Sequence, residues 1–482
     1  MQNLRTDVCV IGSGPGGYVA AIRAGQLGKK VVCVEKASPG GVCLNVGCIP
    51  SKALISAAKQ WDKLSHLDSM GISVSGARLD VEQLQKWKAG IVEKLTFGVR
   101  QLVKSAGGQW VFGTATLLDA NTVEVSGPTG STSIVADNII LATGSRPITV
   151  PGFPIDNQRI HNSDGGLNFP SVPKHLTVIG GGYIGLELGT MWRKLGAEVT
   201  VVEFTEQLLP GNDPELVSVV AKKLKNLGVQ VFLEHKALRY EETDNGLTLF
   251  VVPRSSDGQK DKELAIPTER VLVTVGRRPN SEGLGLEKLG VNIDPRGFVL
   301  VDKQQRTSVP NVFAIGDVCG QPMLAHKASR EAEVAVEVAC GHRSEQDAVA
   351  IPAVIFTDPE IGSVGLTETR AVEKGHRVVT GKYAFAALGR AMAALETDGF
   401  VKVVADADTK QVLGIHIVGP AATDLISEGA FALEMGAFLP DLALTVHPHP
   451  TLGEAIMEAA KAALGESPHV VGGGQKTPSH RS

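Results

Sequence analysis

The sequence predicts an α/β protein built from two halves with parallel sheets, followed by a separate α+β region. The first observation is a unit repeated at residues 7–36 and 176–204, in which an apolar strand, a glycine turn and a helix lead into a second apolar strand. Such units build parallel sheets covered by helices. The second observation is that, beyond residue 350, strand patterns such as FVKVVAD and VLGIHIVG are mixed with a helical LISEGAFALEMG. This mixture favours an α+β domain.

The first unit, residues 7–36, places Gly12, Gly14 and Gly17 after its first strand and Glu35 at the end of its second. The first glycine permits a tight turn, the second lets the backbone approach a pyrophosphate, and the third lets the helix pack on the strand. The positive end of that helix then faces the phosphates. An acid about 20 residues on can accept hydrogen bonds from a ribose, so the unit predicts a dinucleotide site.

The second unit, residues 176–204, has the same spacing, with Gly180, Gly182 and Gly185 in the turn and Glu203 in the place of the acid. A lone GxGxxG is weak evidence, but each unit here has its strand, helix and acid. The chain is therefore expected to hold two Rossmann-like dinucleotide-binding domains. A carboxylate would repel a 2′-phosphate, so Glu203 favours NAD over NADP.

Two cysteines, Cys43 and Cys48 in GGVCLNVGCIPSK, follow the first unit within a few residues. Taken alone, such a pair in a long chain favours a structural disulphide or two buried free thiols. Beside a dinucleotide site, a thiol pair instead favours electron transfer, because neighbouring thiols exchange with disulphides. We therefore interpret the pair as redox-active.

Composition limits the possible functions. The 482 residues predict three or four domains, and Lys plus Arg (47) against Asp plus Glu (51) give a net charge of −4 without long charged runs. This balance argues against nucleic-acid or anionic-membrane partners. Six cysteines are too few for a secreted disulphide scaffold. No signal peptide or apolar stretch of about 20 residues is evident, so we expect a soluble cytoplasmic enzyme, although a processed organellar protein would look the same.

Three further segments lie where the chain is expected to pass bound nucleotides. ILATGSRP, with Thr143 and Gly144, and VLVTVGRRPN, with Gly276, are apolar strands that end in turns of small residues. TSVPNVFAIGD is a strand that ends at Asp317, whose carboxylate could bind the ribityl hydroxyls of a flavin. For an isolated Gly-Asp pair, a solvated turn would be the favoured interpretation.

Taken together, these segments resemble the pyridine nucleotide-disulphide oxidoreductases over almost the whole chain. The motifs that carry the resemblance are GxGxxG with Glu35, CLNVGCIPSK, ATGSRP, GGGYIGLE, GRRPN, FAIGD, MLAHKA, FTDPEIGSVG and HPHPTLGE. Within the family, the resemblance is strongest to the members that oxidise dihydrolipoamide. It implies FAD at the first glycine fingerprint, NAD at the second, and an active site shared across a homodimer.

The resemblance also divides the chain into segments. The expected limits are 1–146 for an FAD domain with the redox disulphide, 147–275 for an NAD domain, 276–349 for a central segment that completes the FAD site, and 350–464 for an interface domain. Residues 465–482 are rich in Gly, Ser and Pro and are expected to form a flexible tail.

The resemblance assigns separate roles to the two sulfurs. Cys48 would lie against the flavin as a thiolate, and Cys43 would exchange with the sulfur of the substrate. His449 would be the base and Glu454 would hold its imidazole in one tautomer. His447 shares the motif but is expected to point elsewhere. The base would come from the partner subunit.

Residues near the flavin are implied in the same way. Lys52 follows Cys48 by one helical turn and would pair with Glu187 beside the flavin. Tyr183 would stack on the flavin or, alternatively, pack in the core. The helix that begins near Ala325 would point its N-terminus at the flavin ring.

Two departures and several alternatives accompany these expectations. Val42 replaces a usual Thr, and SREA follows MLAHKA where an acidic run is usual. The leading hypothesis is an NAD-dependent flavoprotein that oxidises dihydrolipoamide carried by a lipoylated acyltransferase or a glycine-cleavage carrier protein. A glutathione reductase-like enzyme using NAD(P)H is the first alternative, and a redox-inactive scaffold is another. Mercuric and larger thioredoxin reductases are disfavoured because no cysteine follows Cys340.

Overall fold

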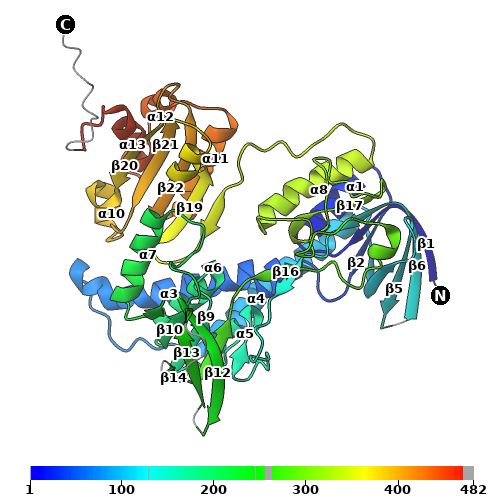
Figure 1. The fold of residues 1–482 in the computed structure, drawn as a ribbon, viewed down its shortest axis with the longest axis horizontal. Helices are drawn as coiled ribbons and strands as arrows, with labels where there is room; N and C mark the ends of the chain where they lie inside the picture. Colours follow the sequence, from blue (N-terminus) through cyan, green and yellow to red (C-terminus); the bar gives the residue numbers. More distant parts are fainter. Residues whose placement is uncertain (1, 129, 245, 256–262, 471–482) are drawn as a thin grey trace.

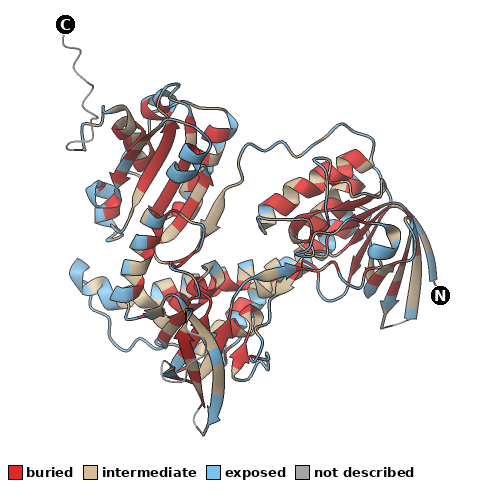
Figure 2. Cartoon of the chain, in the orientation of Figure 1, coloured by how far each residue is buried: buried red, intermediate tan, exposed pale blue. Residues whose placement is uncertain are grey.

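The computed structural model describes residues 2–128, 130–244, 246–255 and 263–470. Figure 1 shows three bodies that each contain a sheet: one on the right with the N-terminus, one below, and one at upper left that holds the last helices. Buried residues are concentrated in the strands and on the inner helix faces of each body (Figure 2). Each body therefore has a core of its own.

The first sheet carries the first glycine turn and has seven strands. Its strands lie in the order β3-β2-β1-β6-β5-β4, and β17 pairs with β6. Val31–Glu35 are buried throughout, as expected for a parallel strand covered on both faces. Helices α1 (Pro15–Gln26) and α8 (Ala325–Ala339) pack together beside the sheet (Figure 1). The strands are β1 (Gln2–Ile11), β2 (Val31–Glu35), β3 (Gln109–Phe112), β4 (Thr114–Leu117), β5 (Thr122–Gly127), β6 (Gly130–Leu141) and β17 (Val312–Ala314).

The second sheet carries the second glycine turn and has five parallel strands in the order β11-β10-β9-β15-β8. These are β8 (Ile160–His161), β9 (His175–Ile179), β10 (Glu198–Val202), β11 (Gln230–Phe232) and β15 (Arg270–Val273). The helices of this body are α5 (Ser163–Gly166), α6 (Tyr183–Lys194) and α7 (Pro214–Asn226). An antiparallel sheet of β12 (His235–Thr243), β13 (Gly246–Pro253) and β14 (Leu264–Thr268) extends from it. Strands β7 (Ser145–Pro147) and β16 (Arg277–Pro279) pair where the chain passes between the first two bodies.

The third body is an antiparallel sheet in the order β18-β19-β22-β21-β20. Its strands are β18 (Ala353–Ile355), β19 (Glu360–Gly365), β20 (Val378–Ala384), β21 (Phe400–Asp406) and β22 (Val412–Gly419). Its helices are α9 (Glu368–Glu373), α10 (Gly389–Ala393), α11 (Ala422–Glu434), α12 (Leu439–Leu444) and α13 (Glu454–Leu464). Helices α11 and α13 pack on the sheet and close its core.

Helices between the first two bodies carry the cysteine motif. They are α2 (Gly41–Val46), α3 (Cys48–Lys63), the short 3₁₀ helix η1 (Leu64–Met70) and α4 (Val81–Ser105). Three further 3₁₀ turns are η3 (Glu287–Leu289), η4 (Gly316–Val318) and η5 (Phe385–Ala387). Helix α3 packs against both α4 and α6. The cysteine motif therefore lies where the first and second bodies meet.

One helical stretch of the described residues, Gly41–Met70, is long and apolar enough to cross a membrane by length and composition. The expectation that no stretch approaches this length was therefore wrong, because the stretch is apolar overall although it contains charged residues such as Lys52. A single stretch of this kind is weak evidence, since a core helix of a globular protein meets the same criterion. Here a third of the stretch is buried, and Lys52 forms an ion pair with Glu187 on α6.

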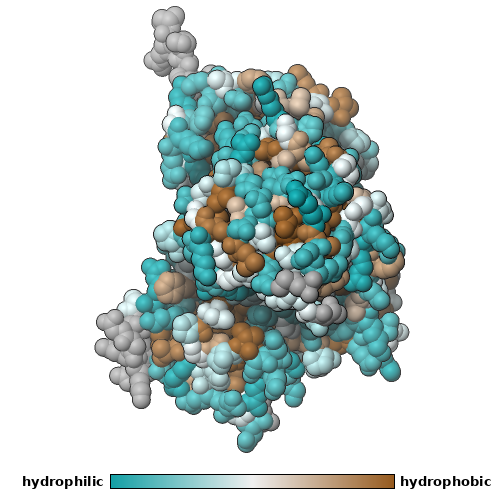
Figure 3. Space-filling view, turned by 90° about the vertical axis from the view of Figure 1, so that its right-hand side faces the viewer, coloured by the Kyte–Doolittle hydropathy of each residue, from teal (hydrophilic) through white to brown (hydrophobic). Residues whose placement is uncertain are grey.

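The surface is mixed in hydropathy (Figure 3), and the first residues of the C-terminal tail pack on the third body. Figure 3 looks at the right-hand side of Figure 1 and shows small hydrophobic areas separated by hydrophilic side chains. Of the expected flexible tail, residues 465–470 are placed: Ser467 Oγ donates to Glu458, and Val470 packs on the core of the third body. Residues 471–482 lie outside the described residues.

We propose the expected limits at 146, 275 and 349 as the domain boundaries.

Candidate active site

A cavity of about 820 Å³ lies between the first sheet, the α2–α3 segment and the first turn of α6. Residues from both glycine units and from the cysteine motif meet in it. The predicted site residues that line it are Gly12, Gly14, Gly17, Glu35, Cys43, Cys48, Lys52, Thr143, Gly144, Tyr183, Glu187, Asp317 and Ala325. The predicted site residues that do not line it are Gly180, Gly182, Gly185, Glu203, Gly276, His449 and Glu454.

The first glycine turn leaves an open cradle at the start of α1. Gly12 has a φ of +98°, and a Cβ there would lie 2.3 Å from the Ala142 carbonyl oxygen. A Cβ on Gly17 would lie 1.9 Å from the Gly12 carbonyl oxygen, whereas one on Gly14 would meet only open space. Glu35 accepts hydrogen bonds from the N–H and hydroxyl of Ser13. The turn therefore fits a pyrophosphate over Gly14 and a ribose at Glu35.

The second glycine turn repeats this geometry at the start of α6. A Cβ on Gly180 would lie 2.5 Å from the Thr274 carbonyl oxygen, and one on Gly182 would meet open space. Glu203 accepts hydrogen bonds from the N–H of Gly181 and from the N–H and hydroxyl of Thr205. This turn lies outside the large cavity, so the two cradles are separate places in the same chain.

The two cysteines stand in the dithiol form at the junction of α2 and α3. Cys43 lies within α2, and Cys48 is the first residue of α3. A hydrogen bond from the Cys43 thiol, aided by the Lys52 ammonium, lowers the pKa of Cys48 to about 7 against the opposing effect of burial. The same hydrogen bond, together with burial, raises the pKa of Cys43. Cys48 is therefore the sulfur that ionises first.

An ion pair lies one helical turn beyond Cys48. Lys52 Nζ is 2.8 Å from Glu187 Oε2, and both residues line the cavity. Glu187 is 4% exposed, while the Lys52 side chain is 31% exposed on the cavity side. The Lys52–Glu187 pair anticipated from the sequence is present. Tyr183 begins α6 and is 44% exposed, so it faces the cavity and does not pack in a core.

A polar chain at Asp317 was missed in the sequence. Ser145 Oγ donates to Asp317 Oδ2 at 2.5 Å, and the Arg277 guanidinium donates to the hydroxyl and the carbonyl of Ser145. All three residues line the cavity. Ser145 and Arg277 belong to the ATGSRP and GRRPN motifs, so the motifs held the signal, but the pairing of β7 with β16 was not visible in the sequence.

His449 and Glu454 form a contact of their own on the third body. His449 Nδ1 lies 2.8 Å from Glu454 Oε1, and Thr451 N–H donates to Glu454 Oε2. Burial opposes ionisation of Glu454, but the Thr451 and His449 hydrogen bonds lower the pKa of its carboxyl. The His449 side chain is 79% exposed, whereas that of His447 is 6% exposed and contacts Glu428. His447 does point elsewhere, and His449 faces outward from its own chain.

The Cys48 pKa can be tested through Lys52. In the Lys52→Met variant we expect the pH midpoint of thiolate formation to rise by about one unit, because a stabilising positive charge is lost. Ultraviolet thiolate absorbance against pH measures this in the reduced protein. Burial raises the pKa values of Cys9, Cys33 and Cys319, so these thiols do not interfere near neutral pH. Lys59→Met is the control, since Lys59 lies on the same helix and contacts Glu396. An unchanged midpoint in Lys52→Met would contradict this electrostatic account.

The comparisons with known proteins agree with this geometry. Residues 6–332 match the family model described as pyridine nucleotide-disulphide oxidoreductase, and residues 351–460 match the dimerisation domain of that family. The dihydrolipoyl dehydrogenase of Geobacillus stearothermophilus is 48% identical over 97% of this chain and 98% of the relative. Dihydrolipoyl dehydrogenase 3 of Haloarcula marismortui is 46% identical over 96% of this chain and 98% of the relative.

A solved structure gives the same result for the fold. The crystal structure of LpdA from Mycobacterium tuberculosis superposes with a TM-score of 0.87 at 26% identity, covering 95% of this chain and 99% of that one. These matches confirm the predicted α/β fold with a C-terminal dimerisation domain, and they confirm the resemblance and the enzyme class drawn from the sequence. The chain belongs to the pyridine nucleotide-disulphide oxidoreductase family.

Proposed function

We propose that the protein oxidises dihydrolipoamide, carried on a lipoylated acyltransferase or a glycine-cleavage carrier protein, to lipoamide and reduces NAD. The observation that carries the proposal is the Cys43–Cys48 dithiol, which lines the same cavity as the first glycine cradle and the Lys52–Glu187 pair. The names of the relatives support the choice of substrate. The bacterial and archaeal relatives and the scarcity of cysteines support a cytoplasmic location.

FAD fits the large cavity and NAD fits the second cradle. In the proposal, Gly14 and Glu35 hold the FAD pyrophosphate and ribose, Asp317 and Ala325 lie toward its ribityl and ring, and Thr143 and Gly144 complete the wall. In the same proposal, the second glycine turn (Gly180, Gly182 and Gly185) holds NAD together with Glu203 and Gly276. Tyr183, which lines the large cavity, stacks on the flavin and moves aside for NAD. When bound, the flavin supplies two-electron exchange between the dithiol and NAD.

The cysteines carry the covalent step. The first substrate thiol gives its proton to His449, and its thiolate attacks Cys43 Sγ of the oxidised pair, which breaks the Cys43–Cys48 bond, forms a mixed disulphide and releases Cys48 as a thiolate. His449 passes this proton to solvent and takes the proton of the second substrate thiol, whose thiolate attacks the substrate sulfur of the mixed disulphide. The bond between that sulfur and Cys43 breaks, lipoamide leaves with its new disulphide, and His449 returns the second proton to Cys43 as it becomes a thiol. The Lys52 ammonium, which lowers the pKa of Cys48, favours this division of roles because it stabilises Cys48 as the leaving thiolate.

The base is proposed to come from a second copy of the chain. His449 does not line the cavity of its own chain, yet it is highly exposed and held by Glu454 on the dimerisation domain. In a homodimer, His449 of the partner subunit would face Cys43. This arrangement makes the active site dependent on the dimer.

A direct assay separates this proposal from the alternative of a glutathione reductase-like enzyme. We expect the purified protein to turn over dihydrolipoamide with NAD ~10²-fold or more faster than oxidised glutathione with NADPH. The reason is that the Glu203 carboxylate disfavours a 2′-phosphate at the second cradle. Initial rates of both reactions under matched conditions measure this, and Cys43→Ser serves as the background control. A preference for glutathione and NADPH would overturn the proposal.

A further inference from the structure

Glu187 stands between two cavities. It lines the large cavity beside the cysteines and also a second cavity of about 500 Å³ between α3, α6 and the third body. Its Oε2 accepts from Lys52 Nζ at 2.8 Å, and its Oε1 accepts from the backbone N–H of Phe356 at 2.8 Å. Both oxygens of this buried carboxylate are therefore engaged, one by the redox helix and one by the segment that follows β18.

Phe356 contacts the other member of the ion pair as well. Its ring centroid lies 4.4 Å from Lys52 Nζ, within the range of a cation–π contact. One residue therefore donates to the carboxylate and faces the ammonium group. Because Lys52 is partly exposed to the cavity, the ring limits where its charge can move.

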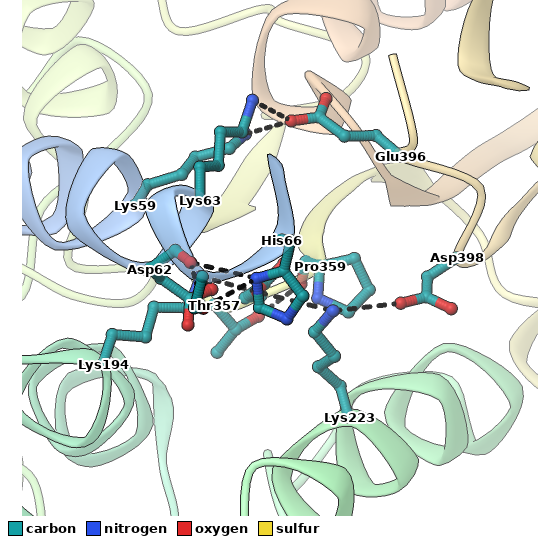
Figure 4. A network of polar contacts seen from close by, with 12 residues as sticks. Lys59, Asp62, Lys63, His66, Lys194, Lys223, Thr357, Pro359, Glu396 and Asp398 are labelled. Atoms are coloured by element: carbon teal, nitrogen blue, oxygen red, sulfur yellow. Dashed lines mark hydrogen bonds and ion pairs between the residues drawn. The ribbon is translucent and has the colours of Figure 1, made fainter. Parts of the chain in front are cut away.

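The backbone around Phe356 is fixed by the polar network in Figure 4. Asp358 lies 2.6 Å from Lys194 Nζ on α6, and the same ammonium is 3.4 Å from Asp62 on α3. The Thr357 hydroxyl donates to the Pro359 carbonyl within the segment. The 356–359 segment is therefore tied to α6 directly, and to α3 through Lys194.

We propose that Phe356 is a positioning residue for the Lys52–Glu187 pair, so that the dimerisation domain holds the charges beside the redox thiols in place. Phe356 lies within residues 351–460, which match that domain, while Lys52 and Glu187 lie outside it. The inference rests on the proposed roles of Cys48 and Lys52. If Phe356 has this role, the position of the Lys52 charge, and with it the pKa of Cys48, depends on a domain that is distant in the sequence.

The test is the pH midpoint of Cys48 thiolate absorbance in full-length reduced dimer. In Phe356→Leu the midpoint should rise by about 0.5 unit, which corresponds to about 0.7 kcal/mol, because the ring no longer holds the Lys52 charge near the thiol. Phe356→Tyr keeps a ring and should restore the original value. Phe400→Leu is the matched control, since the Phe400 ring lies 5.7 Å from Lys382 Nζ in the same body and neither residue lines the cavity of the cysteines.

A double variant separates failure of this inference from failure of the proposed function. In a Lys52→Met background, Phe356→Leu should add no further rise. An unchanged midpoint in Phe356→Leu, while Lys52→Met shifts it, would overturn the inference alone. An equal rise with and without Lys52 would also overturn it, since the ring would then act without Lys52. No shift in Lys52→Met would instead remove the proposed role of Lys52 on which the inference depends. Should Phe356→Leu not fold, Asp358→Asn should give a rise of the same sign, and no rise there would count against the inference.

Discussion

The His449→Gln variant should oxidise dihydrolipoamide ~10²-fold or more slowly than the wild type, in line with the usual contribution of a general base. Glutamine cannot take the proton that each substrate thiol must lose before its sulfur attacks a disulphide. The variant keeps the size of the side chain, and Glu454 remains bonded to the Thr451 N–H. Steady-state rates with dihydrolipoamide and NAD measure the loss.

Reduction of the bound flavin by NADH should survive this substitution, because that half-reaction does not use the substrate thiols. His447→Gln is the matched control: it lies two residues away, is buried against Glu428, and should leave turnover within a few-fold of wild type. Near-wild-type turnover in His449→Gln, or an equal loss in both variants, would contradict the assignment of the base.

Much of this site could be predicted because many of its features depend on residues that are close together in the sequence. The turn at Gly12 and the turn at Gly180 each need a positive φ and a missing Cβ, and both requirements appear directly as glycine. Lys52 follows Cys48 by one helical turn, so predicting that the two side chains share a helix face required only the prediction of a helix there. Local patterns therefore sufficed for the cradles and the redox helix.

The contacts missed in the sequence join residues that are far apart along the chain. Phe356 meets Glu187 across 169 positions, and Ser145 meets Asp317 across 172. No local pattern encodes such pairs, because they follow from how whole sheets pack. The membrane-length stretch was missed for another reason: it is apolar overall although it contains charged residues such as Lys52, which forms an ion pair with Glu187 in the fold.

Two variants that are inactive as homodimers should regain activity when they are combined in one heterodimer. If the Cys43–Cys48 pair of one subunit works with His449 of its partner, a heterodimer of Cys43→Ser and His449→Gln contains one site with both groups intact and one site with neither. Heterodimers isolated with two different affinity tags should then show about half the wild-type turnover per dimer, since one of two symmetric sites is complete. Each homodimer of the single variants should show turnover close to background.

The structural reason for this expectation lies in the exposure of the two groups. The cysteines line the cavity of their own chain, whereas His449 is 79% exposed on a domain that matches the family's dimerisation model. A site contained within one chain would leave every heterodimer subunit with one missing group, and no turnover would return. The double variant carrying both substitutions on one chain, paired with a wild-type subunit, is the control: each of its sites lacks one group. It should therefore be as inactive as either homodimer, and activity at half the wild-type level there would contradict the shared site.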